Sequence, residues 1–355
     1  ILLGSGDSTN GTGSTLTTGS DNIFLGYQAG KTTSTTDNNI FVGTQAGYST
    51  TVGHSNLFFG TTSGYNNTEG DYNNFFGKEA GKLNTQGDNN TFVGYRAGYS
   101  NVSGGKNIFV GPEAGYSSNN TDGNIGVGYQ TGYYNLAAYN MFMGYQAGYK
   151  NTTGLNNVFL GYKAGSAIGS NGENQTGDYN VCVGNQAGYS NTSGNRNLFL
   201  GYLSGYRNTE GARNIFLGEN TGRSNTTGSE NIFIGMGIGG NDTGVGYFNT
   251  TGNKNAFIGY RAGNKNTEGS SNIFFGTEAG RDNTTGGRNI YMGYRSGREA
   301  TTAYNNINIG NRAGQTNTTG NANIFIGYLS ASDCANNRTG NIMIGQETGK
   351  VNAAD

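Results

Sequence analysis

The sequence contains no tryptophan, one proline, one histidine and two cysteines. Two cysteines are too few for a disulfide scaffold, and the chain lacks the His and Cys ligands of a zinc site. A Ser-His-Asp or Cys-His site would have to use His54, which lies in a predicted turn. We therefore expect no catalytic residue, no metal site and no cofactor, and predict that the chain is not an enzyme.

Charge and long apolar runs are scarce as well. The 21 basic and 22 acidic residues are spread along the chain and give a net charge of −1, so no basic stripe suits a phosphate backbone. No apolar run approaches the ~20 residues of a membrane-spanning helix. Binding to nucleic acid and insertion into a membrane are not expected. Calcium-binding nonapeptide repeats need a regular column of aspartates, and the repeat pattern indicates no Asp column.

What the chain has in excess is glycine, with 66 residues, and only 33% of it is hydrophobic. Such a composition alone would favour disorder. The aromatic residues argue against disorder, because they recur in register within a repeat of Asn, three mostly apolar residues and Gly. Of the 18 steps between successive anchor asparagines, 14 are 17 residues long. These anchors are Asn22, Asn39, Asn56, Asn73, Asn90, Asn107, Asn124, Asn140, Asn157, Asn180, Asn197, Asn214, Asn231, Asn255, Asn272, Asn289, Asn306, Asn323 and Asn341.

Each part of the repeat has a physical interpretation. The three apolar residues are a short strand rich in β-branched and aromatic side chains. The seventh residue after the anchor is small except at Ile238, and the eighth is Gly except at Ala331, which suits a tight corner. Asn-Thr-Thr-Gly is turn chemistry, and nothing shows the period of a helix. The pattern predicts an all-β, parallel β-solenoid of about 19–20 coils, one coil per repeat.

The same periodicity predicts the domain organisation. Residues 1–21 form a degenerate first coil, and residues 22–349 form continuous 17-residue coils. Insertions fall near 166–178 and 239–251, where solenoids accommodate them at corners. Residues 350–355 are a tail or the start of another coil. Cys182 and Cys334 lie eight coils apart, too far for an internal disulfide.

The anchor asparagines are predicted to form a ladder of stacked side-chain amides that bond to the coils above and below. The alternative is a polar binding stripe. The ladder residues named for this prediction are Asn22, Asn39, Asn56, Asn73, Asn90 and Asn107.

Alternation along the strand makes both of its faces apolar, because the first and third residues face one way and the second faces the other. We place Ile and Leu inside a thin coil and the Phe column outside, as an oligomer interface. The reverse assignment puts the Ile and Leu columns outside. Either way an apolar stripe remains, which predicts self-association, with a trimer around a shared Phe axis preferred over a filament. The interface residues are Phe24, Phe41, Phe58, Phe75, Phe92, Phe109, Phe142, Phe159, Phe199, Phe216, Phe233, Phe257, Phe274 and Phe325.

The pattern Asn39-Ile40-Phe41-Val42-Gly43, followed by Ala46-Gly47, resembles the β-roll heads of YadA-like trimeric autotransporter adhesins. It is also similar to repeat segments of phage tail fibres. The resemblance covers residues 22–349 and implies a trimeric, adhesive protein located outside the cell, at the cell surface or on a virion. It departs from those heads in its longer repeat and in carrying Phe where they usually have a small residue.

Two classes of function follow. The first is a structural or adhesive fibre module that associates with itself. The second is a surface-binding solenoid that recognises glycan, ice or, as a tail-fibre segment, a host receptor. Tyr residues in the fifth and ninth positions could bind glycans or stack along the coil edges. Several turns match the Asn-x-Ser/Thr acceptor of N-glycosylation, and the possible sites are Asn151, Asn191, Asn225, Asn283 and Asn317.

Charged residues of the sixth position alternate in sign on neighbouring coils, as in Glu79, Arg96 and Glu113. The same column holds Arg261, Glu278 and Arg295. We interpret both runs as surface ion-pair ladders. The alternative is the carboxylate pair of a sugar-cleaving enzyme.

Overall fold

The computed structural model describes residues 2–3, 11–13, 16–167, 175–237, 243–333 and 339–349. The chain divides into two compact units, residues 1–176 and 177–355, and the division falls at the first predicted insertion. Within the described ranges all regular elements are short β-strands. The first unit holds β1 (Leu2–Leu3), β2 (Ile23–Leu25), β3 (Ile40–Val42), β4 (Leu57–Phe59), β5 (Asn74–Phe76), β6 (Thr91–Val93), β7 (Ile108–Val110), β8 (Ile125–Val127), β9 (Met141–Met143) and β10 (Val158–Leu160). The second unit holds β11 (Val181–Val183), β12 (Leu198–Leu200), β13 (Ile215–Leu217), β14 (Ile232–Ile234), β15 (Ala256–Ile258), β16 (Ile273–Phe275), β17 (Ile290–Met292), β18 (Ile307–Ile309), β19 (Ile324–Ile326) and β20 (Ile342–Ile344).

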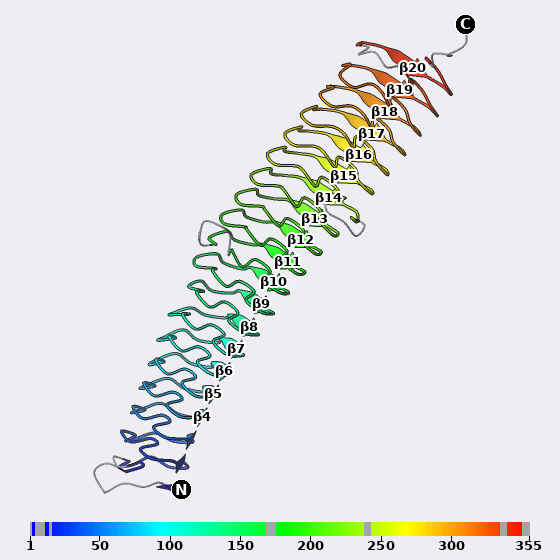
Figure 1. The fold of residues 1–355 in the computed structure, drawn as a ribbon. Helices are drawn as coiled ribbons and strands as arrows, with labels where there is room; N and C mark the ends of the chain where they lie inside the picture. The colour runs from blue at the N-terminus through cyan, green and yellow to red at the C-terminus, as the bar shows by residue number, and fades with distance from the viewer. Residues whose placement is uncertain are drawn as a thin grey trace. The chain divides into compact units, whose positions relative to one another are not determined.

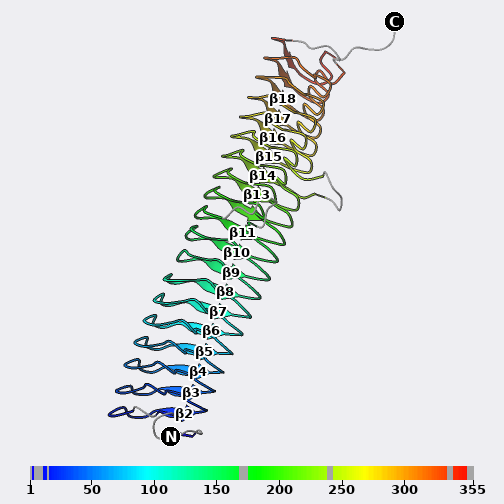
Figure 2. The same ribbon diagram turned by 60° about the vertical axis from the view of Figure 1, so that its left-hand side comes forward.

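Within each unit, every strand pairs in parallel with the strand of the next coil, so the predicted parallel β-solenoid is confirmed (Figures 1 and 2). The register places each residue on its equivalent one repeat later: Phe24 pairs with Phe41, and Phe199 pairs with Phe216. The pairing continues outside the strands. The N–H of Gly47, for example, donates to the carbonyl of Ser63 at 2.9 Å. Nearly the whole coil therefore contributes to the ladder between coils.

The Phe column lies inside its own coil, and the prediction that Phe lies outside as an oligomer interface is wrong. Phe24, Phe41 and Phe216 are completely buried within the single chain. Successive rings stack nearly parallel, with centroids 4.7 to 5.4 Å apart. The reverse assignment, with the first and third strand residues outside, is the one that the structure has.

The room for the rings comes from the residues opposite them. The seventh residue is a buried Ala in most coils, such as Ala46. The eighth residue is Gly, and a Cβ at Gly47 would lie 2.4 Å from the ring of Phe41. Gly47 also has a φ of +57°, which favours glycine. The thin interior therefore accepts a large ring because the opposite wall has almost no side chains.

Four coils lack an aromatic residue in this column: Gly126, Cys182, Asn308 and Met343 replace it. Asn308 is completely buried between the coils of Tyr291 and Phe325. Its amide oxygen and nitrogen have no hydrogen-bond partner among the described residues. Burying an amide without hydrogen-bond partners costs folding free energy, so Asn308 destabilises the core of the second unit.

The anchor asparagines form a ladder that combines amide-to-amide bonds, as predicted, with bonds to the backbone. In the second unit, for example, the side-chain nitrogen of Asn272 donates to the side-chain oxygen of Asn255 at 3.2 Å. The side-chain oxygen of Asn39 accepts a hydrogen bond from the backbone N–H of Asn56 at 2.9 Å. The side-chain nitrogen of Asn39 donates to the carbonyl of Gly53 at 2.9 Å. Each such anchor thus ties the start of its strand to the next anchor and to the turn that closes its own coil. All six ladder residues named above are buried.

A second Asn column, in turns where the sequence indicated turn chemistry alone, forms another amide-to-amide ladder. The side-chain nitrogen of Asn84 donates to the side-chain oxygen of Asn67 at 2.7 Å, and Asn101 bonds to Asn84 in the same way. The following Thr column adds a third ladder. The hydroxyl of Thr51 donates to the carbonyl of Thr68 at 3.1 Å. The Asn-Thr-Thr-Gly turn is therefore a stacking device as well as a turn.

The two insertions interrupt the stack less than their length suggests. Residues 168–174 and 238–242 lie outside the described part of the chain. The strands beside the first insertion are paired, β10 with β9 and β11 with β12. Across the second, β14 pairs directly with β15. Val245 and Gly246 take the seventh and eighth positions, with Val245 buried and Gly246 against the ring of Phe233. Counting along the repeat from Asn231 places Ile238 and Gly239 at these two positions. The structure shows instead that the second insertion ends before Val245.

We predict that Asn308→Phe raises the free energy of unfolding by about 2–4 kcal/mol. The substitution removes a buried amide without partners and completes the column of stacked rings. The measurement is the shift of the denaturation midpoint. Thr319→Phe, at an exposed turn position of the same coil, should change stability little. A destabilised Asn308→Phe protein would mean that Phe cannot fit there.

We further predict that Asn73→Ala destabilises the first unit by about 2–4 kcal/mol. The change leaves the N–H of Asn90 and the carbonyl of Gly87 without the bonds that Asn73 gives them, and each unmade buried bond costs about 1–3 kcal/mol. Chemical denaturation measures the loss. Asn119→Ala, at an exposed position, is the control and should fall within ~0.5 kcal/mol of the parent.

Candidate functional surfaces

The first and third residues of strands β2 to β20, called here the strand face, point away from the core. None of them is charged. Leu200 and Phe275, for instance, are 45% and 51% exposed. The members with the greatest exposure are Ile23, Leu25, Ile40, Phe59, Phe76, Val93, Ile108, Met143, Leu200, Ile215, Ile232, Ile273, Phe275, Met292, Ile309, Ile342 and Ile344. In each unit the strand face is thus a predominantly apolar surface without charge, in which Asn74 and Thr91 are the polar residues.

Tyr side chains of the fifth position extend this surface. Tyr129, Tyr145 and Tyr162 are exposed, and their rings stack at 5.2 and 5.4 Å. A second Tyr column, of the ninth position, lies in the turns, where Tyr48 stacks on Tyr65 at 4.8 Å. Both columns show the stacking along coil edges that the sequence analysis considered, and the fifth-position column leaves its rings accessible.

The ion-pair columns are present in part. Glu79 pairs with Arg96 of the next coil and with Lys82. Glu278 pairs with Arg295 at 2.8 Å, with Arg298 at 3.2 Å and with Arg281. The structure shows no ion pair of Glu113 or Arg261 in the described residues, where Glu113 accepts a hydrogen bond from Gln130 instead.

These contacts act on the carboxyl groups. Burial alone would raise the pKa of Glu278, but the hydrogen bond from Arg295 and the charges of Arg281 and Arg298 outweigh it and lower the pKa. For Glu79 the hydrogen bond from Arg96 is the main cause of a lowered pKa. A proton donor to a glycosidic bond needs a raised pKa. The arrangement therefore favours the ion-pair interpretation over the alternative of a sugar-cleaving carboxylate pair.

Aspartates do share a column, contrary to the sequence analysis. Asp71, Asp88 and Asp122 each lie two residues before an anchor, in the column of His54, with Gly105 between the last two. Their carboxylates accept hydrogen bonds from the backbone of the preceding coil, such as Asp71 from His54 N–H at 2.6 Å. His54 Nδ1 accepts the N–H of Asp37 in the same manner. The described residues hold no cluster of three or more His, Cys, Asp or Glu that suits a metal ion.

The structure corrects the predicted glycosylation sites. The five possible glycosylation sites, Asn151, Asn191, Asn225, Asn283 and Asn317, are buried. Their side-chain nitrogens are donors in the second Asn column, as when Asn225 bonds to Asn208 at 2.7 Å. A glycan cannot attach to these nitrogens in the folded coil, so that prediction is wrong.

Cys182 is buried in the Phe column, where burial raises the pKa of its thiol. Cys334 lies outside the described residues.

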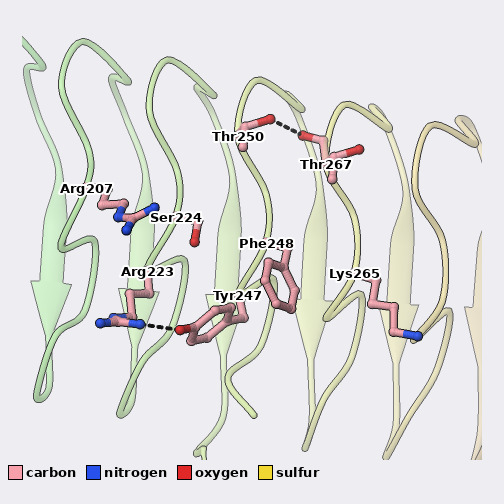
Figure 3. Close-up of a pocket in the computed structure, with 8 residues that line it drawn as sticks. All are labelled: Arg207, Arg223, Ser224, Tyr247, Phe248, Thr250, Lys265 and Thr267. Carbon is pink, nitrogen blue, oxygen red and sulfur yellow. Dashed lines mark hydrogen bonds between the residues drawn. The ribbon is translucent and has the colours of Figure 1, made fainter. Parts of the chain in front are cut away.

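A hollow in the second unit is the most distinctive local feature (Figure 3). It has a volume of about 660 Å³ and is lined by Arg207, Arg223, Ser224, Tyr247, Phe248, Thr250, Lys265 and Thr267. Tyr247 and Phe248 meet edge to face, with ring centroids 4.7 Å apart. Arg223 donates a hydrogen bond to the hydroxyl of Tyr247. In the sequence, this hollow is marked by the aromatic pair at the ninth and tenth positions. The pair is hard to recognise because the insertion before it obscures the repeat register.

Comparison with protein-family models, with curated proteins and with solved structures found no match. Among the described residues, no helix is long and apolar enough to cross a membrane. The functions of the strand face and of the hollow must therefore be inferred from the residues that form them.

We predict that Glu278→Gln destabilises the second unit by about 1–3 kcal/mol at pH 7, the range for hydrogen bonds to charged groups. Because the folded-state pKa of Glu278 is lowered, its contribution is complete above the unfolded pKa of ~4.3 and is lost as the pH falls through the folded value. The difference between parent and variant should shrink between pH 5 and pH 3.

The control is Glu230→Gln, because Glu230 and Arg213 form an exposed pair at 3.5 Å. Exposed pairs contribute ~0–1 kcal/mol, so this variant should match the parent at both pH values. Thermal unfolding at each pH measures both effects. A pH-independent loss in Glu278→Gln would show that packing, and not the charge, is responsible.

Proposed function

We propose that this chain is a structural module that pairs with a second copy of itself through the strand face. It would contribute to a fibre-like or adhesive assembly outside the cell, at its surface or on a virion. The observation that carries the proposal is a predominantly apolar sheet surface, partly or largely exposed, on which no coil from β2 to β20 places a charge. Large exposed apolar patches are rare on proteins that stay monomeric.

A second copy fits this face better than an unrelated partner does. The surface has no charge by which to recognise a polar partner, but an identical surface is equally apolar. Successive equivalent rings lie 4.8 Å apart, and a copy has side chains at the same spacing. Ridges of one face can therefore interdigitate with grooves of the other over many coils, as in sheet-on-sheet packing.

The available area supports a stable pair. A three-residue strand is about 10 Å long, and ten coils at ~4.8 Å span about 48 Å, so one unit offers about 500 Å² of strand face. The fifth-position Tyr column enlarges this toward the ~800 Å² per partner of a standard interface. The trimer expected from the sequence rested on an external Phe axis, which the buried rings remove. A face-to-face dimer is the form that we propose.

The extracellular adhesive role is supported by the resemblance of the repeat to adhesin heads and tail-fibre segments. The alternative of ice binding by Thr rows has less support. The hydroxyls of the Thr column donate to the backbone of the next coil, as Thr250 does to Thr267 at 3.0 Å. These hydroxyl hydrogens stabilise the stack and are not directed to an external lattice.

We predict that the triple variant Leu200→Thr, Ile215→Thr and Ile232→Thr weakens self-association. All three side chains belong to the strand face and are exposed. Thr is compatible with this column, because Thr91 occupies it in β6. Sedimentation velocity should show a dimer for the parent chain at micromolar concentration and a larger monomer fraction for the variant, with unchanged circular dichroism.

The matched control replaces three exposed apolar residues outside the strand face, Val52, Leu136 and Leu155, with Thr. This variant should sediment like the parent. A parent chain that stays monomeric at high concentration would refute the proposal, and so would a control that dissociates as completely as the strand-face variant. A trimer that the strand-face variant abolishes would keep the interface but correct the number of copies.

A further inference from the structure

The hollow of Figure 3 has a counterpart in the first unit, and the two share a pattern. In three successive coils the tenth position holds Ser224, Phe248 and Lys265 in the second unit. In the first unit the same positions hold Ser117, Tyr134 and Lys150, which also line a hollow. A ring beside a small Ser leaves the space in both cases. In both units the ring meets a preceding Tyr edge to face, at 4.7 Å.

The two hollows differ in their arginines. Arg207 and Arg223 line the second hollow. The equivalent positions of the first unit hold Ser100 and Tyr116, which carry no charge. The second hollow therefore differs from the first by two guanidinium groups in its lining.

Neither arginine is neutralised. Lys265 pairs with Asp282 at 2.8 Å, but Arg207 and Arg223 have no ion pair within the described ranges. Arg223 lies between two rings, with its guanidinium carbon 5.6 Å from the centroid of Tyr206 and 5.5 Å from that of Tyr247. This sandwich fixes the guanidinium in place, and its Nε has no hydrogen-bond partner in the described part of the chain. A fixed, unpaired guanidinium is suited to an anionic ligand group.

We propose that this hollow binds an acidic sugar. The carboxylate is held by Arg207 and Arg223, and the apolar face of the pyranose ring packs on Phe248. The hydroxyl oxygens of Thr250 and Thr267, whose hydrogens already bond to the backbone, accept hydrogen bonds from the sugar hydroxyls. The volume of about 660 Å³ lies within the ~300–1,000 Å³ of ligand sites. The site uses no residue of the strand face, so it does not depend on self-association.

The test is calorimetric titration of the full chain with trigalacturonate and with its methyl ester, which keeps the rings and removes the charge. We expect trigalacturonate to bind and the ester to bind at least tenfold more weakly. Arg207→Ser with Arg223→Tyr converts the lining to that of the first unit and should lower affinity for trigalacturonate at least tenfold. Phe248→Ser, which places the residue of Ser224 and Ser117 in this column, should weaken both ligands.

Two control variants make the outcome specific. Arg312→Gln removes one exposed charge elsewhere in the second unit, at a position where Gln28 and Gln45 share its positive φ. Tyr134→Ser removes the ring of the first hollow. Both should leave trigalacturonate affinity within twofold of the parent. Equal binding of the ester, equal weakening by Arg312→Gln, or competition by sulfate at the same concentration as the sugar would each overturn the proposal, as would the absence of binding at millimolar concentration.

Discussion

Stacking in register, with each residue lying on its equivalent one coil away, is the constraint from which the rest of this structure follows. A residue type is useful only if it can contact a copy of itself at about 4.8 Å. Asn satisfies this condition because it both donates and accepts, Phe because rings stack, and Thr because its hydroxyl reaches the next carbonyl. Like charges do not satisfy it. The excess of Gly, Asn and Thr and the low share of charged residues, 12%, follow from this rule.

The same rule explains where charges do occur. Charged residues of the sixth position alternate in sign, as in Glu278 and Arg295, so that each lies beside an opposite charge. Aspartates can share the column two residues before the anchor, because each carboxylate accepts a hydrogen bond from a backbone N–H of the preceding coil. Asn308 breaks the rule, since an amide in a column of rings finds neither a ring nor a partner. Local stability should therefore follow how well each residue matches its column.

The repeat length and the strand position could be predicted from the sequence, because periodicity fixes columns directly. The inward face could not, because alternation makes Ile23 and Phe24 equally plausible core residues. The decisive information was the Gly opposite each ring, and its meaning is visible only when Gly47 is seen against Phe41. The glycosylation sites failed for a related reason. A motif match in the turn says nothing of burial, and the turn asparagines are as buried as the anchor asparagines.

Function in such a chain has to come from uniform faces or from departures, since a perfect repeat presents the same chemistry at every coil. The strand face is the uniform case. Its residues face away from the core, so selection for folding alone does not require Leu200 or Phe275 to be apolar, and Asn74 and Thr91 show that the strand tolerates polar residues there. The hollow is the case of departure. Phe248, just after the second insertion, and Arg207 and Arg223, on the two preceding coils, differ from the Ser and Tyr residues that are common in their columns. Arg223 contributes to folding through its contacts with Tyr206 and Tyr247, but the charges of Arg207 and Arg223 have no ion pair among the described residues, and a contact outside the coil better explains their retention.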